Sequence, residues 1–211
     1  MRRIVILIIF LHSSFLAIYS QSVSLFFESM PDSILPLLTA KNRHDMLDFY
    51  GNKMDAKVRN RFEDYVQLDT LTDSYLHLTL SKASTAEMKL LHANDSSLII
   101  AFVQTVSAPA RDSRIAFFNS QWQRLQWLQL PLTVTSDFFS SAPDSVSHEM
   151  NFAQRSVDDM RLVEIYVSPS EPVFTLRLST DVLADDEKRL ARRYVRDVSY
   201  RWTGLNFERL Q

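Results

Sequence analysis

The stretch "LIIAFVQTV", residues 98–106, decides the fold class, because it is apolar on both faces and therefore predicts an interior strand. Before it, "SYLHLTLSK" (74–82) alternates at its three leucines and predicts a half-buried strand. After it, "SRIAFFNSQWQRLQWL" (113–128) predicts a hairpin that turns at Asn119-Ser120. Strands that follow one another through short turns predict an antiparallel sheet.

Helical patterns flank these strands. Pro31-Asp32-Ser33 predicts the start of a first helix, and Asn42 predicts the cap of a second, answered by Asp45 three residues later. Residues 143–160 and 184–195 have amphipathic spacing and predict two further helices. We therefore expect an α+β fold in which helices cover an antiparallel sheet.

Two segments that begin with Pro-Asp-Ser, at residues 31–33 and 143–145, each precede strands and an aromatic hairpin. The second hairpin, "SYRWTGLNFERL" (199–210), is predicted to turn at Thr203-Gly204. This repetition suggests an internal duplication with two similar helix-plus-sheet halves, at 23–130 and 131–211. One continuous domain is the alternative.

Composition excludes several classes of function. The chain of 211 residues has no cysteine, which excludes disulfides, thiolate catalysis and zinc–thiolate sites. Its two glycines cannot form a phosphate-binding loop. A net charge of -2 gives no general attraction for nucleic acid. We expect no cofactor and no metal.

The first 22 residues have the three-part pattern of a secretory signal peptide. Arg2 and Arg3 precede an apolar run that extends to about Ile18, and Ser20 and Ser22 provide small residues for cleavage. No later apolar run is long enough to span a bilayer. We expect export to the periplasm, the outer-membrane surface or the medium, with no transmembrane span after cleavage.

Candidate catalytic groups have simpler explanations. His44 and Asp48 share a helix face as in some metal sites, but an exposed helix with an ion pair has the same spacing. The acidic pairs at 158–159 and 185–186 fall at element ends, where acids cap helices. No nucleophile elbow supports a hydrolase. An Asp/His hydrolase would have to use one of the histidines after the signal peptide, which are His44, His77, His92 and His148.

Surface candidates are aromatic and basic. Trp122, Trp127 and Trp202 lie on the two predicted hairpins and form a candidate binding surface, although hairpin aromatics usually cover the core. The basic run at 188–196 predicts a solvated helix face, with an acidic partner or an anionic envelope component as the alternative.

The segments "MPDSILPLL" (30–38), "NRHDMLDFY" (42–50), "LTDSYLHLTLSKA" (71–83) and "YRWTGLNFERL" (200–210) resemble a family of exported Bacteroidetes proteins that is described as a domain of unknown function. The resemblance extends from about Phe27 to the end and implies export. It supplies no catalytic residue. It also implies O-glycosylation at Asp-Ser/Thr-aliphatic sequences, for which Ser33, Thr70 and Ser145 are the candidates and Thr70 is favoured.

The sequence therefore favours an exported envelope protein that acts as a non-enzymatic binding or assembly module. Its partner would be an envelope protein, a glycan or a lipid, and nucleic acid is not expected. A periplasmic carrier or chaperone for an apolar ligand is the alternative, which an enclosed apolar cavity would favour. An Asp/His hydrolase is the weaker alternative.

Overall fold

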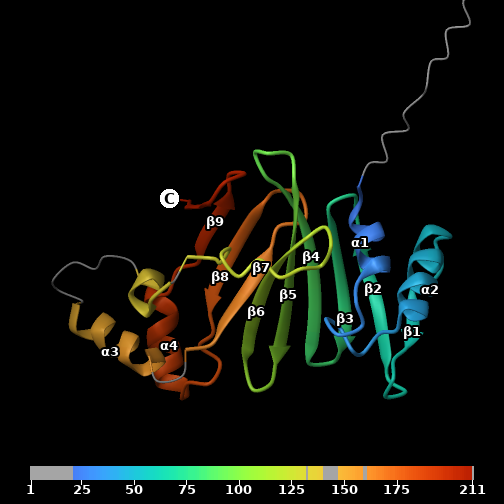
Figure 1. The fold of residues 1–211 in the computed structure, drawn as a ribbon. Helices are drawn as coiled ribbons and strands as arrows, with labels where there is room; N and C mark the ends of the chain where they lie inside the picture. Colours follow the sequence, from blue (N-terminus) through green and yellow to red (C-terminus); the bar gives the residue numbers. More distant parts are fainter. Residues whose placement is uncertain (1–20, 132, 140–146, 159–160, 211) are drawn as a thin grey trace, which may run out of the picture.

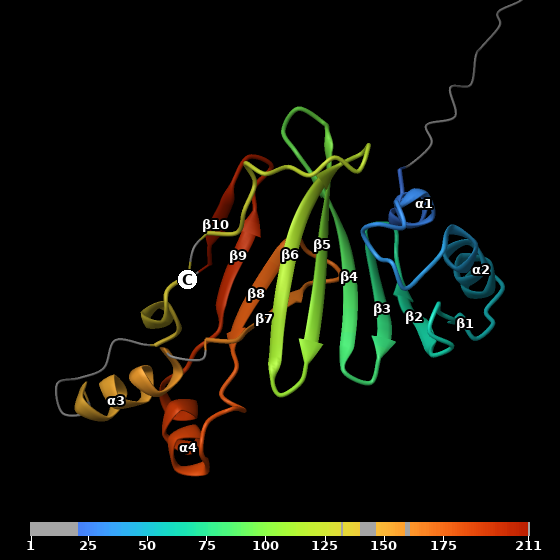
Figure 2. The same cartoon turned by 60° about the horizontal axis from the view of Figure 1, so that its bottom comes forward.

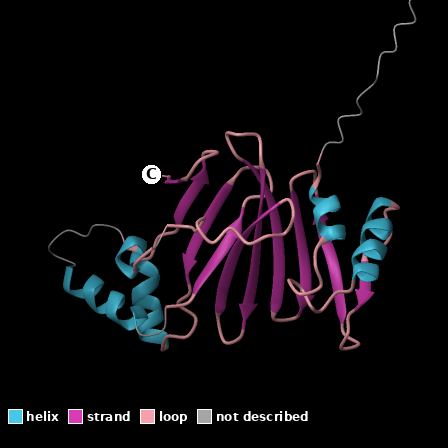
Figure 3. Ribbon diagram, in the orientation of Figure 1, coloured by secondary structure: helices cyan, strands magenta, loops and turns pink. Residues whose placement is uncertain are grey.

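The computed structural model describes residues 21–131, 133–139, 147–158 and 161–210. Almost all of the predicted signal peptide and the Pro-Asp-Ser segment at 143–145 lie outside these residues. The described chain has four α-helices and two antiparallel sheets, so the predicted α+β class is confirmed (Figures 1 and 3).

The larger sheet is a six-stranded meander in which each strand pairs with its neighbour in sequence. The predicted strands at 74–82 and 98–106 are present as β3 and β5, and β5 pairs on both sides. The predicted hairpin after β6 is reduced to one isolated bridge between Phe118 and Arg124. The strands are β1 (Lys57–Arg59), β2 (Tyr65–Leu71), β3 (Tyr75–Ser81), β4 (Ser84–His92), β5 (Leu98–Ser107) and β6 (Arg111–Asn119).

One face of this sheet is covered by α1 (Val23–Ser29) and α2 (Ala40–Gly51), at the β1–β3 end (Figures 1 and 2). Alternate side chains of the strands point toward these helices, as the period of two requires. They form a first apolar core with the helices, which includes Phe27, Met46, Leu76, Leu78 and Met88.

The smaller sheet has the strand order β10-β9-β8-β7. Its strands are β7 (Val163–Val167), β8 (Val173–Leu178), β9 (Val198–Trp202) and β10 (Phe207–Arg209). The predicted closing hairpin is confirmed as β9 and β10, which pair in register around a turn that contains Gly204.

A second apolar core joins the smaller sheet to the other face of the larger one. Phe117 and Ile99 of the larger sheet contribute to it, together with Phe174 and Trp202 of the smaller sheet. Helices α3 (Ser147–Asp158) and α4 (Asp185–Tyr194) and the short 3-10 helix η1 (Thr135–Phe138) close its far end (Figure 1). This second core contains residues from both sides of the domain junction predicted at 130–131. The internal duplication and the division into two domains stay predictions.

Strand β7 meets the larger sheet with its unpaired edge. The N–H of Val163 donates to Asp112 Oδ1 at 3.2 Å, and the N–H of Ile165 donates to Ser113 Oγ at 2.9 Å. The N–H of Val167 donates to Glu87. Side chains of β6 and β4 thus satisfy edge donors that would otherwise be left without partners in a sheet-to-sheet contact.

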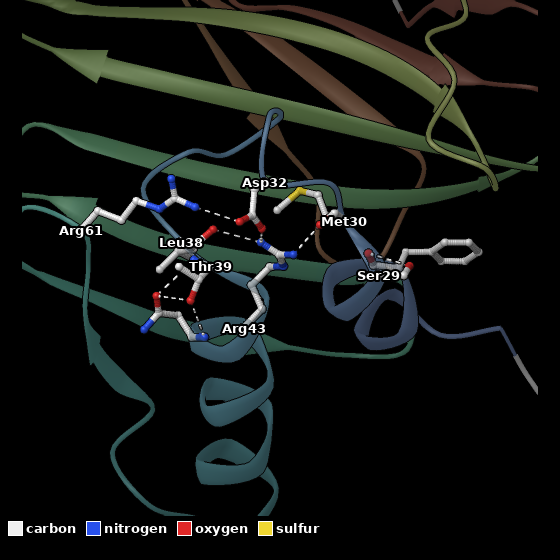
Figure 4. A network of polar contacts seen from close by, with 9 residues as sticks. Ser29, Met30, Asp32, Leu38, Thr39, Arg43 and Arg61 are labelled. Atoms are coloured by element: carbon white, nitrogen blue, oxygen red, sulfur yellow. Dashed lines mark hydrogen bonds and ion pairs between the residues drawn. The ribbon is translucent and has the colours of Figure 1, made fainter.

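The first predicted helix is wrong. Residues 31–38 form a series of turns, because Pro36 lacks the N–H that a helix interior needs. The carboxylate of Asp32 binds Arg43 and Arg61, not the free N–H groups of a helix (Figure 4). The cap of α2 is Thr39, which exchanges hydrogen bonds with Asn42, so Asn42 lies inside the helix as the partner of the cap.

Among the described residues, no helix combines the length and the apolar character needed to cross a bilayer.

Candidate functional site

Three turns that are distant in sequence converge at one end of the two sheets. They are the β4–β5 turn, the segment that follows β6, and the β9–β10 turn. Between them lies a cavity of about 420 Å³, which we call the Trp127–Trp202 pocket. Its apolar lining comes from Leu98, Ile99, Leu125, Trp127, Trp202 and Leu205.

Cross-sheet hydrogen bonds fix the floor of this pocket. Trp202 Nε1 donates to the backbone oxygen of His92 at 2.8 Å, which ties the smaller sheet to the end of β4. The N–H of Asn94 donates to the backbone oxygen of Gly204 at 3.0 Å, which ties the two turns together. These bonds hold the turns that line the pocket in fixed positions.

Gly204 is required by this geometry. Its φ of +97° is a conformation that L side chains rarely adopt, and a Cβ there would lie 2.1 Å from Asn94 Oδ1. Glycine therefore permits this close approach without strain, whereas any other residue would be strained by this φ and would displace the Asn94 side chain.

The segment after β6 is held by its own polar groups. Asn119 Oδ1 accepts the N–H groups of Gln121 and Gln123, and the N–H of Leu125 donates to the oxygen of Phe117 at 2.8 Å. This arrangement presents Trp127 to solvent with 70% of its surface exposed. Leu205, across the pocket, is 72% exposed.

The three tryptophans proposed from the sequence do not share one surface. Trp127 and Trp202 line the same pocket, whereas Trp122 packs against Phe118, with ring centroids 5.4 Å apart, at the edge of the first core. Sequence reasoning missed Leu205 and Leu125. An apolar residue in the turn after Thr203-Gly204 was the signal that could have identified Leu205.

The histidines lie on separate elements, and each one that pairs does so with a single carboxylate. His44 Nδ1 lies 2.7 Å from Glu28 Oε1, which raises the pKa of His44, but both side chains are exposed. His77 Nδ1 lies 2.9 Å from Asp69 Oδ2 on the neighbouring strand. No group of three or more potential metal-binding side chains is found within the described residues.

One buried acid has a structural explanation. Glu87 accepts the hydroxyl hydrogen of Tyr75 at 2.6 Å and receives the edge N–H of Val167. Burial raises the pKa of Glu87, although both hydrogen bonds favour its charged form. Because both partners belong to the junction between the sheets, Glu87 supports that junction.

The basic helix face is partly neutralised. Asp181 accepts ion pairs from Lys188 at 2.6 Å and from Arg192 at 3.1 Å, and these cations lower the pKa of Asp181. Arg189 pairs with Asp186 in the first turn of α4. Surface pairs of this kind contribute little to stability and are typical of a solvated helix.

The candidate glycosylation residues have different environments. Ser33 is exposed in the turns before α2. Thr70 is half-buried in β2, where it pairs with His77 beside a bulge. Ser145 lies outside the described residues, and modification at all three positions stays a prediction.

Comparison with known proteins returns a family and a fold. A family model described as a protein of unknown function, DUF3256, matches residues 15–207. A solved domain of an uncharacterized protein from Porphyromonas gingivalis W83 is similar, with a TM-score of 0.75 and 26% sequence identity. The similarity covers 89% of this chain and 97% of that one. No curated protein matches the chain.

Proposed function

Since the chain belongs to the DUF3256 family, whose function is unknown, we propose from its own geometry that it is a non-enzymatic binding module of the bacterial envelope. In this proposal the protein is exported and binds a partner at the Trp127–Trp202 pocket. The chemistry of the pocket, not an activity known for a relative, supports the choice.

The observation that carries the proposal is the exposure of two large apolar side chains around a preorganised pocket. Most of the surface of Trp127 and Leu205 is exposed, and the two residues flank a cavity large enough for one bulky apolar group. Exposed aromatic anchors beside an apolar pocket are typical of binding hot spots, because burial on binding removes their area from water.

The pocket favours a binding module over a carrier. A carrier would enclose an apolar ligand, whereas this cavity lies among surface turns and is bordered by exposed side chains. If the protein is a binding module, we expect its partner to insert one apolar group into the pocket, while the rest of the partner stays outside.

Photo-crosslinking in the native host tests the proposal. A photoreactive amino acid replaces Leu205, and the control replaces Phe62, which is equally exposed in the β1–β2 turn. We expect one partner to crosslink at Leu205, not at Phe62, and to disappear when Trp127→Ala is added. A crosslinking pattern that is identical at both positions would refute the proposed site.

A further inference from the structure

A second cavity adjoins the Trp127–Trp202 pocket and has a different chemistry. Its volume is about 410 Å³, and it shares Ala93, Asn94, Trp202 and Gly204 with the first pocket. Lys89 of β4 lines this second cavity. The side chain of Lys89 is the feature that calls for an explanation.

Lys89 is a buried cation without an acidic partner. The residue is only 3% exposed, yet no carboxylate of the described residues forms an ion pair with it. Its Nζ donates to the oxygen of Pro169 at 2.7 Å and to Ser74 Oγ at 3.3 Å. An ammonium has three donors, and beside these two acceptors it faces only the ring of Tyr75 among the groups whose contacts the described residues show.

Burial without compensation makes the charge costly. Burial lowers the pKa of Lys89, and no neighbouring charge opposes the shift. The two hydrogen bonds that Lys89 makes to the protein need a donor but not a charge. The Tyr75 ring, whose centroid lies 6.0 Å from Nζ, attracts the charge but does not neutralise it, and an anion bound in the cavity would do so.

The rest of the lining is mixed, with apolar groups such as Leu90, Leu91 and Pro172 beside polar ones. The cavity contains no Asp or Glu among its lining residues, and its polar side chains include Ser74, His92, Ser170 and Thr203. A cation surrounded by hydroxyl and amide groups and free of acids is complementary to an anion. Trp202 lines both this cavity and the Trp127–Trp202 pocket.

We infer that Lys89 binds the carboxylate of a ligand whose apolar part occupies the neighbouring Trp127–Trp202 pocket. The inference deepens the proposed function and rests on it, because it names the chemistry of the bound group. Two sources have this chemistry, which are the free C-terminus of a partner chain with an apolar last residue, and a free acid with an aliphatic tail.

Matched probes test for the carboxylate. Octanoate and octanol share an apolar tail, and an N-acetylated pentapeptide ending in leucine is compared with its C-terminal amide. Binding to the full chain is followed by calorimetry. We expect the carboxylate form of at least one pair to bind about tenfold to a hundredfold more tightly than its neutral partner, as a charge-assisted hydrogen bond predicts. The pair that shows the preference identifies the source.

Lys89→Met supplies the decisive variant, because methionine retains the length and removes the charge. We expect the preference to fall to less than about threefold in Lys89→Met and to persist in Lys82→Met, an exposed lysine in the β3–β4 turn. As a measurement that needs no variant, the pKa of Lys89 in the wild-type protein should rise when the carboxylate binds.

Three results would overturn the inference. They are equal binding of the charged and neutral probes, a preference that survives in Lys89→Met, and no binding of either carboxylate at about 10 mM. Equal binding that weakens in Trp127→Ala would remove the carboxylate inference alone and leave the proposed pocket standing. Absence of probe binding together with absence of a crosslink at Leu205 would remove both.

Discussion

Replacing Arg43 with methionine tests how the segment before α2 is held. The Arg43 side chain is 2% exposed, and its Nη1 donates to Asp32 Oδ1 and to the oxygen of Leu38, each at 3.0 Å. Its Nη2 donates to the oxygen of Met30 (Figure 4). One side chain thus holds both ends of the segment of turns at residues 30–38.

The expected loss follows from what the substitution leaves behind. The residues that supply the two accepting carbonyls, Met30 and Leu38, are buried, and each carbonyl left without a partner costs about 1–3 kcal/mol. Asp32 is half-exposed and keeps its bond to Arg61, so its cost is small. Removing the desolvated guanidinium, whose Nε has no partner, offsets part of the loss. We expect Arg43→Met to lower the free energy of unfolding by about 2–4 kcal/mol.

Urea unfolding followed by circular dichroism measures this loss. Arg61→Met is the matched control, because it removes the exposed partner of the same carboxylate and should cost less than about 1 kcal/mol. A loss below about 1 kcal/mol for Arg43→Met, or equal losses for the two variants, would refute the assignment of Arg43 as the anchor of this segment.

Three further outcomes are expected. Gly204→Ala should lower the free energy of unfolding by about 1–3 kcal/mol in thermal or urea unfolding, because it combines a positive φ with a clash at Asn94, and an unchanged midpoint would contradict the required glycine. Glu87→Gln should remove one pH-dependent contribution to stability: the folded state retains the proton of Glu87, so this residue's contribution in the wild type falls as pH rises from the ordinary pKa of 4.5 through the raised one, and identical pH profiles for the two proteins in urea unfolding would contradict this. Ser113→Ala should cost about 1–3 kcal/mol, measured by urea unfolding, because the N–H of Ile165 loses its acceptor, and hydrogen exchange at Ile165 should accelerate with it.

The sheet was predictable because its signals are local. The leucines of β3 alternate, and the apolar run of β5 requires cover on both faces, so strand positions followed from the period alone. Helix α4 and the β9–β10 hairpin also follow from local signals, namely the distribution of charge and the turn at Gly204.

The helix predicted at residue 31 failed because Pro36 cannot complete a helical turn and because Arg43 binds the residue that was expected to cap it. Asp32 has the sequence context of a cap, but Arg43, eleven residues later, binds its carboxylate. The preference of Asp for helix caps does not reveal that a buried arginine will bind the same carboxylate. Burial of this kind is hard to expect from sequence, because arginine is rarely fully buried unless it is paired. Segments 30–38 and 42–50, two of the four that resemble the family, are thus joined by the bonds of Arg43 to Asp32 and Met30.

The candidate site was only partly predictable for the same reason. Aromatic composition identified Trp127 and Trp202, but the pocket depends on the meeting of three turns that no sequence period reports. The sequence does not indicate that Lys89 is buried. Apolar and polar residues do not alternate cleanly along β4, and Lys89 is buried only because the smaller sheet packs over it.

The most direct test of the proposed binding site is the dissociation constant of the partner captured at Leu205, measured for wild type, Trp127→Ala and Phe62→Ala. Trp127 is exposed, so its removal should leave the folded state intact. If the Trp127–Trp202 pocket is the binding site, Trp127→Ala weakens binding by about thirtyfold, as a hot-spot loss near 2 kcal/mol predicts, while Phe62→Ala leaves it unchanged. Equal dissociation constants for all three proteins would contradict the pocket as the site of recognition.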